Sequence, residues 1–136
     1  MMKKNKNLVL ILSLIAALSF IVNCGEDFDV TLKATSLELN EQCPMTIDEY
    51  TRLDNTETHP GKIFQYNYTL TTEDAGVLNT DPKSLGDQIK QQSLMVVKTN
   101  ADLQIFRDNE VTLVYVYNKL DGSEFFRFEI LPEEYK

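Results

Sequence analysis

Cys43 and His59 are the residues whose types could support nucleophilic catalysis, with an aspartate as a third member. A predicted strand separates the two, and Pro44 follows the cysteine directly. No glycine-rich turn nearby could hold an oxyanion, which such a centre requires. His59 precedes Pro60 and Gly61 in a predicted turn, and a single histidine cannot form a histidine-rich metal site. We therefore expect no catalytic residues, no metal and no cofactor here.

Carboxylates are the next group that could do chemistry. The chain has 21 acidic residues, so some pair must lie close in space by chance. Their spacing singles out no glycosidase-like pair, and the sequence has no phosphate-binding loop and no G-x-S-x-G motif. A small periplasmic hydrolase that uses carboxylates or Cys43 remains an alternative to a non-enzymatic protein.

Arg52 is the polar residue with the clearest candidate role. It lies in a predicted strand beside tyrosines, where it could pair with Asp48, Asp54 or Glu129 across the sheet. Two interpretations stay open for Arg52, Asp48 and Asp54: a structural ion pair and a ligand-binding site.

Aromatic residues are more numerous on the predicted strands than a core of this size can absorb. Some of them should therefore form an exposed patch that suits a protein or peptide partner. The residues predicted for this patch are Tyr50, Tyr115, Tyr117 and Phe125.

The elements that position these residues follow from periodicity and turn signals. The segment 28–40 alternates like a strand but also has a helical face, and its residue types favour a helix. A second helix is predicted over 82–97, with Asp81 as N-cap, and a short helical turn over 101–107. Strands are predicted over 45–58, 63–70, 111–117 and 124–131, the last two joined through Asp121-Gly122. The order α-β-β-α-β-β predicts an α+β domain, with helices packed on one face of a four-stranded antiparallel sheet.

The N-terminus has the layout of a secretory signal: Lys3, Lys4 and Lys6, then an apolar run over 8–22. The run is short for a membrane span, which needs about 20 residues. Ile21-Val22-Asn23-Cys24-Gly25 resembles a bacterial lipobox, although Asn23 departs from the small residue usual there. That resemblance implies cleavage after residue 23 and a lipid on Cys24.

The predicted organisation is a signal peptide over 1–23, a lipidated Cys24 with an acidic spacer to residue 27, and one domain over 28–136. The protein would face the periplasm or the cell surface. If Cys24 is lipidated, Cys43 is buried, free or bridged to another molecule. If it is not, a soluble secreted domain with a bridge from Cys24 to Cys43 becomes possible.

Charge limits the partners. The chain has 13 basic and 21 acidic residues, and loss of the basic signal peptide makes the mature domain more acidic still. Such a surface repels nucleic acid and anionic lipid headgroups. Any membrane link must therefore be the lipid, and the expected partner is a protein or a peptide.

Two stretches resemble a family of small exported bacterial domains of uncharacterised function. The first is the P-x-x-x-D-x-x-T-R-L-D run over 44–54, and the second is P-G-K over 60–62 followed by Y-x-Y-T-L over 66–70. The resemblance covers most of residues 40–134 and implies a cystatin-like or similar fold, but no activity. Fold analogy alone adds a third alternative, a secreted enzyme inhibitor.

Overall fold

The computed structural model describes residues 27–136, so the predicted signal peptide and Cys24 lie outside the described residues. The elements follow in the order α2 (Asp27–Asn40), β1 (Met45–Asp48), β2 (Thr51–His59), β3 (Ile63–Leu70), α3 (Ala75–Leu78), α4 (Pro82–Thr99), η2 (Ala101–Leu103), α5 (Gln104–Asp108), β4 (Thr112–Asn118), β5 (Glu124–Ile130) and α6 (Pro132–Tyr135).

These elements confirm the α+β class, but the predicted four-stranded sheet is wrong: the sheet has five strands, in the order β1-β2-β3-β4-β5. The stretch predicted as one strand over 45–58 turns back on itself at Glu49 and Tyr50. Asp48 stabilises that turn, because its carboxylate accepts a hydrogen bond from the Tyr50 amide at 2.8 Å.

The predicted all-antiparallel pairing is also wrong, since the two central strands, β3 and β4, run parallel. Parallel neighbours need a crossover connection of a dozen residues or more. Here the chain between Leu70 and Thr112 supplies it through α3, α4, η2 and α5. All other strand pairs are antiparallel.

Local signals hold the crossover helix in place. Asp81 caps α4, since its carboxylate accepts from the Ser84 amide at 2.9 Å, and Pro82 opens the first turn. Gly86 lets the helix approach the sheet, because a Cβ there would lie 3.2 Å from the Phe126 ring.

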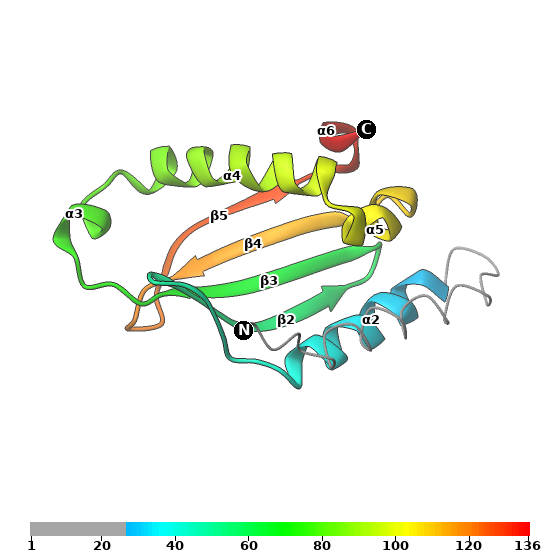
Figure 1. Cartoon of the computed structure of the whole chain (residues 1–136), viewed down its shortest axis with the longest axis horizontal. Coiled ribbons are helices and arrows are strands. Elements are labelled where there is room, and N and C mark those ends of the chain that lie inside the picture. The colour runs from blue at the N-terminus through cyan, green and yellow to red at the C-terminus, as the bar shows by residue number, and fades with distance from the viewer. Residues whose placement is uncertain (1–26) are drawn as a thin grey trace, which may run out of the picture.

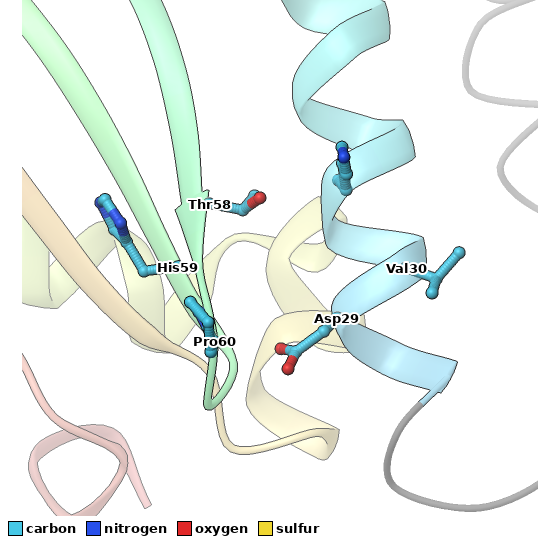
Figure 2. A pocket seen from close by; sticks show the side chains of 6 residues that line it. Asp29, Val30, Thr58, His59 and Pro60 are labelled. Carbon is cyan, nitrogen blue, oxygen red and sulfur yellow. The ribbon is translucent and has the colours of Figure 1, made fainter.

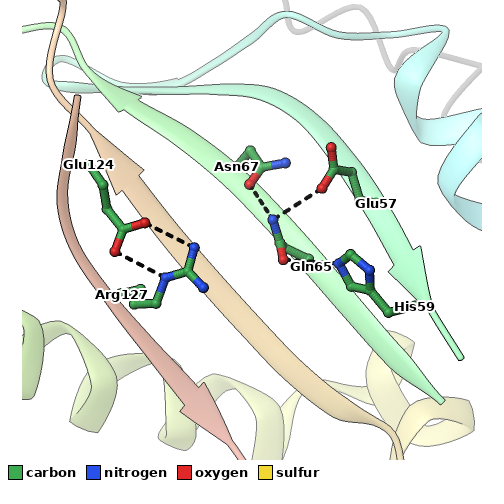
Figure 3. Close-up of polar contacts among 6 residues, drawn as sticks. All are labelled: Glu57, His59, Gln65, Asn67, Glu124 and Arg127. Atoms are coloured by element: carbon green, nitrogen blue, oxygen red, sulfur yellow. Dashed lines mark hydrogen bonds and ion pairs between the residues drawn. The ribbon is translucent and has the colours of Figure 1, made fainter. Parts of the chain in front are cut away.

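Two long helices cover one face of the sheet. In Figure 1, α4 runs along β5 at one side, and α2 runs along β2 at the other. Leu32 of α2 and Phe64 of β3 are fully buried in the core beneath them. The opposite face carries polar side chains (Figure 3), among them Gln65, whose amide bonds Glu57 and Asn67.

Candidate functional site

Six aromatic rings form a two-by-three array on the helix-covered face of the central strands. They come from three adjacent strands in register, so each row crosses β3, β4 and β5. The first row is Tyr66, Tyr115 and Phe128; the second is Tyr68, Tyr117 and Phe126. Neighbouring rings within a row are stacked, with centroids 4.7–5.2 Å apart. Such cross-strand aromatic pairs stabilise a sheet.

A groove of about 570 Å³ lies above the tyrosine part of this array, which we call the tyrosine groove. One wall is α4, and the other is β1 with the first residue of β2. Its lining residues are Ile47, Asp48, Thr51, Tyr66, Tyr68, Ile89, Gln92, Ser93, Val96, Leu103, Tyr115 and Tyr117.

The four tyrosine hydroxyls in the groove make no hydrogen bond to any residue of the described range 27–136. No fully buried polar side-chain atom in that range lacks a partner, so each of these hydroxyls must reach solvent. The hydroxyl of a buried or interfacial tyrosine normally forms a hydrogen bond with a partner. The floor of the groove is therefore apolar in its body and polar at its tips, with four hydrogen-bonding groups available to a ligand.

Burial keeps these phenols protonated. It raises the pKa of Tyr117 to about 12, and the charge of Asp48 adds to the effect. The pKa values of Tyr66, Tyr68 and Tyr115 are raised further, first by burial and then by neighbouring phenols. At neutral pH all four hydroxyls can thus donate a hydrogen bond to a ligand acceptor.

The predicted aromatic patch is divided by the structure. Tyr115 and Tyr117 lie in the tyrosine groove, but Tyr50 is half exposed in the turn between β1 and β2 and does not line it. Phe125 is buried, with the Lys119 ammonium 5.1 Å from its ring centroid. Sequence reasoning missed Tyr66 and Tyr68 for the patch, because their alternation with Phe64 and Leu70 suggested core positions.

The structure divides the predicted polar site, because Arg52 and Asp54 stay together and Asp48 lies apart from them. Arg52 pairs with Asp54 at 2.5 Å, and the Thr69 hydroxyl donates to the same carboxylate at 2.5 Å. Both acceptor oxygens of Asp54 are thus engaged in structural contacts. Asp48 takes no part in this pair and lines the tyrosine groove.

Cys43 and His59 do not form a catalytic pair. Cys43 precedes β1, whose Met45 pairs with Leu53, whereas His59 is the last residue of β2. Cys43 lies two residues beyond the Met45 level on the side of His59, which leaves roughly four residues of strand, about 13 Å, between the two. Burial, followed by the charge of Asp54, raises the pKa of the Cys43 thiol, the opposite of what an activated nucleophile needs.

Where the pKa of a carboxyl group is displaced within residues 27–136, it is lowered. This holds for Asp81, Glu110, Asp121 and Glu134. They lie in a helix cap, a turn or ion pairs, whereas a general acid needs a raised pKa. Among residues 27–136, no group of three or more His, Cys, Asp or Glu side chains could hold a metal ion.

A second hollow, of about 340 Å³, lies between α2 and the turn after β2. Figure 2 shows Thr58 pointing toward α2 and His59 pointing to the other side of β2. Asp29 closes one end, because its carboxylate accepts from the Lys62 amide at 2.7 Å and the Gly61 amide at 3.2 Å. These bonds use the two backbone amides of the turn and fix α2 to it, so we interpret the hollow as the contact region between α2 and the sheet.

Within residues 27–136, no helix is long and apolar enough to cross a membrane.

Comparison with known proteins places the chain in a family without an assigned role. Residues 29–126 match the family described as "Domain of unknown function (DUF8479)". No curated protein matches the sequence.

Three solved structures share the fold. A candidate secreted protein from Pseudomonas aeruginosa has a TM-score of 0.64 at 14% identity, covering 85% of this chain and 100% of that one. The pilotin EpsS of the Vibrio vulnificus type 2 secretion system has a TM-score of 0.64 at 7% identity, covering 82% and 94%. The type II secretion pilotin AspS from Vibrio cholerae has a TM-score of 0.60 at 11% identity, covering 80% and 93%. These likenesses give no support to the expected cystatin-like fold.

Proposed function

The chain belongs to this family of domains of unknown function, and we propose that it is a non-enzymatic envelope lipoprotein that binds a protein or peptide partner in the tyrosine groove. The lipid on Cys24 would hold the domain at the membrane. The groove would then hold a segment of the partner.

The observation that carries this proposal is the set of four groove hydroxyls without a partner in the described residues. A surface that offers stacked aromatic bodies and free hydrogen-bond donors has the composition of a protein interface, where tyrosine is enriched. The upper rim adds exposed aliphatic side chains, Ile47 and Val96, both about half exposed. A bound segment could bury these side chains and engage the hydroxyls together.

The structural likenesses support the same proposal. Two similar structures are pilotins of type II secretion systems and a third is a candidate secreted protein. They favour export to the envelope and a role beside other proteins rather than catalysis. Identity of 14% or less carries over the fold only, so the partner has to be found by experiment.

The anchor rests on the lipobox-like run that ends at Cys24. Because α2 begins at Asp27, only two residues lie between the lipidated cysteine and the first helix. At about 3.5 Å per residue that distance is short, so the domain would stay close to the bilayer surface. A fatty acid fed to cells should label the protein, and Cys24→Ala should abolish the label. Label retained in that variant would contradict the anchor.

The groove can be tested in living cells with a photo-crosslinking amino acid. Val96 lines the tyrosine groove, whereas its neighbour Met95 is similarly exposed but does not. A photo-crosslinker at position 96 should therefore give a discrete adduct, and one at position 95 should not. The adduct should disappear when Tyr68 is replaced by alanine, and mass spectrometry would identify the captured protein. Equal adducts at both positions would refute the groove as the binding site.

A further inference from the structure

Among the described residues that line the tyrosine groove, Asp48 is the only charged one. It is the last residue of β1 and is exposed to solvent. One carboxylate oxygen accepts from the Tyr50 amide at 2.8 Å. No ion pair is formed by Asp48 within residues 27–136, so its charge has no counterion there.

The carboxylate is close enough to act on the groove floor. Asp48 and Tyr117 line the same groove, and after burial the charge of Asp48 is the second cause that raises the pKa of Tyr117. A ligand that lies over Tyr117 therefore meets the negative charge of Asp48. Since the other lining residues are neutral, this field is not cancelled inside the groove.

This inference rests on the proposed function of the groove. We propose that the bound segment carries a lysine or arginine that pairs with Asp48. Apolar side chains next to it would lie between α4 and β1, over the tyrosines. The cation would form a charge-assisted hydrogen bond with the free carboxylate oxygen. The apolar side chains would contact Ile47 and Val96, and backbone carbonyls of the segment would accept from the tyrosine hydroxyls.

Charge complementarity excludes the opposite kind of ligand. Glu49 follows Asp48, and the whole chain has a net charge of −8. An acidic peptide, a nucleic acid or an anionic headgroup would be repelled at the mouth of the groove. A basic and apolar peptide would be steered toward it, and its binding would weaken as salt is added.

A random peptide library displayed on phage tests this inference with the full-length protein held in detergent. Peptides would be selected separately on the wild type, on Asp48→Asn, on Glu49→Gln and on Val96→Arg. Glu49→Gln is the matched control, because it removes the neighbouring carboxylate that does not line the groove. Val96→Arg blocks the groove itself.

We expect lysine and arginine beside apolar residues to be enriched on the wild type and on Glu49→Gln, but not on Asp48→Asn. A selected peptide should bind Asp48→Asn about tenfold more weakly, as expected for one hydrogen bond to a charged group. Peptides that depend on the groove but show no basic enrichment would overturn the Asp48 pairing and leave the proposed function standing. Peptides recovered equally on Val96→Arg would overturn both.

Discussion

Asn40, the last residue of α2, substitutes for a missing strand along β2. β1 pairs with β2 only between Thr51 and Leu53, so beyond that point no strand of residues 27–136 adjoins this edge of β2. At Thr56 the Asn40 side chain fills this role. Its carbonyl oxygen accepts from the Thr56 amide at 2.7 Å, and its amide nitrogen donates to the Thr56 carbonyl at 2.9 Å. One side chain thus satisfies both backbone groups of a residue that is only 2% exposed.

Asn40→Ala should therefore destabilise the fold markedly. The Thr56 amide would be left without a partner, which costs about 1–3 kcal/mol, whereas the Thr56 carbonyl would keep only the Ser36 hydroxyl at 3.1 Å. We therefore expect a loss of about 2–3 kcal/mol, out of a total stability of about 5–15 kcal/mol. For a domain of this size that lowers Tm by roughly 10–15 °C.

The measurement is thermal and urea unfolding of the chain without its first 24 residues, followed by circular dichroism. Gln42→Ala is the control, because Gln42 is exposed just beyond the same helix end. Ser36→Ala should be intermediate, since the Ser36 hydroxyl bonds the Thr56 side chain at 2.8 Å. If Asn40→Ala melts within about 2 °C of Gln42→Ala, the two backbone bonds do not hold α2 on β2, and this reasoning fails.

Three further outcomes are expected. Phe64→Ala removes a fully buried ring and should lower the free energy of unfolding in urea by about 3–5 kcal/mol. Gln65→Ala, on the opposite face, should lower it by less than about 1 kcal/mol. Equal losses of stability would mean that the two faces of β3 are misassigned. Because the folded pKa of Tyr117 is raised from 10.0 to about 12, the neutral phenol stabilises the fold below pH 10, and this stabilisation is lost as the pH rises through 12. Ultraviolet titration near pH 11 should show less tyrosinate in the folded than in the urea-unfolded chain, and identical curves would contradict it. Since the pKa of the Cys43 thiol is raised from 9.0, iodoacetamide should alkylate it more slowly than an unfolded cysteine at pH 8.5, as followed by mass spectrometry; a faster reaction would point to an activated thiol.

Elements with strong local signals could be predicted from the sequence. Asp81-Pro82 gives the start of α4, because a cap and an N1 proline act within one turn. The alternation over 63–70 gives β3 with both ends as observed. The hairpin of β4 and β5 was also predicted within a residue or so, since Asp121-Gly122 sets its turn.

The sheet topology was predicted less well, because strand direction depends on the connection between strands. The sequence places some forty residues with helical signals between β3 and β4, and that length suits a crossover between parallel strands. An antiparallel hairpin would need only a few residues. The stretch over 45–58 was wrongly predicted as one strand, because the turn at Glu49 and Tyr50 that divides it contains neither glycine nor proline.

The site was predicted only in part for a physical reason. Alternation along β3 correctly puts Tyr66 and Tyr68 on the same face as Phe64. It cannot say how much of that face the helices cover. Phe64 is fully buried, whereas Tyr66 and Tyr68 keep part of their surface. Whether an aromatic residue belongs to core or groove is decided by the ends of helices elsewhere in the chain.

The width of the sheet explains one dimension of the groove. α2 lies along β2 and α4 lies along β5, three strand spacings away (Figure 1). At about 4.8 Å per spacing the two helices stand roughly 14 Å apart, whereas helices in contact lie about 8–10 Å apart. The remaining gap lies above β3 and β4. Side chains as long as tyrosine are needed there to fill the lower part of the gap, and their hydroxyls reach its open upper part.

The length of α2 explains the other dimension. The helix begins near the turn after β2, where Asp29 bonds the Lys62 amide, and it ends at Asn40 above Thr56. It therefore covers only the His59 half of β2. The six residues from Thr56 back to Thr51 span about 16 Å, and α2 does not extend over them. This open half faces the register positions of Tyr66 and Tyr68, so the residue that ends α2 also sets where the tyrosine groove begins.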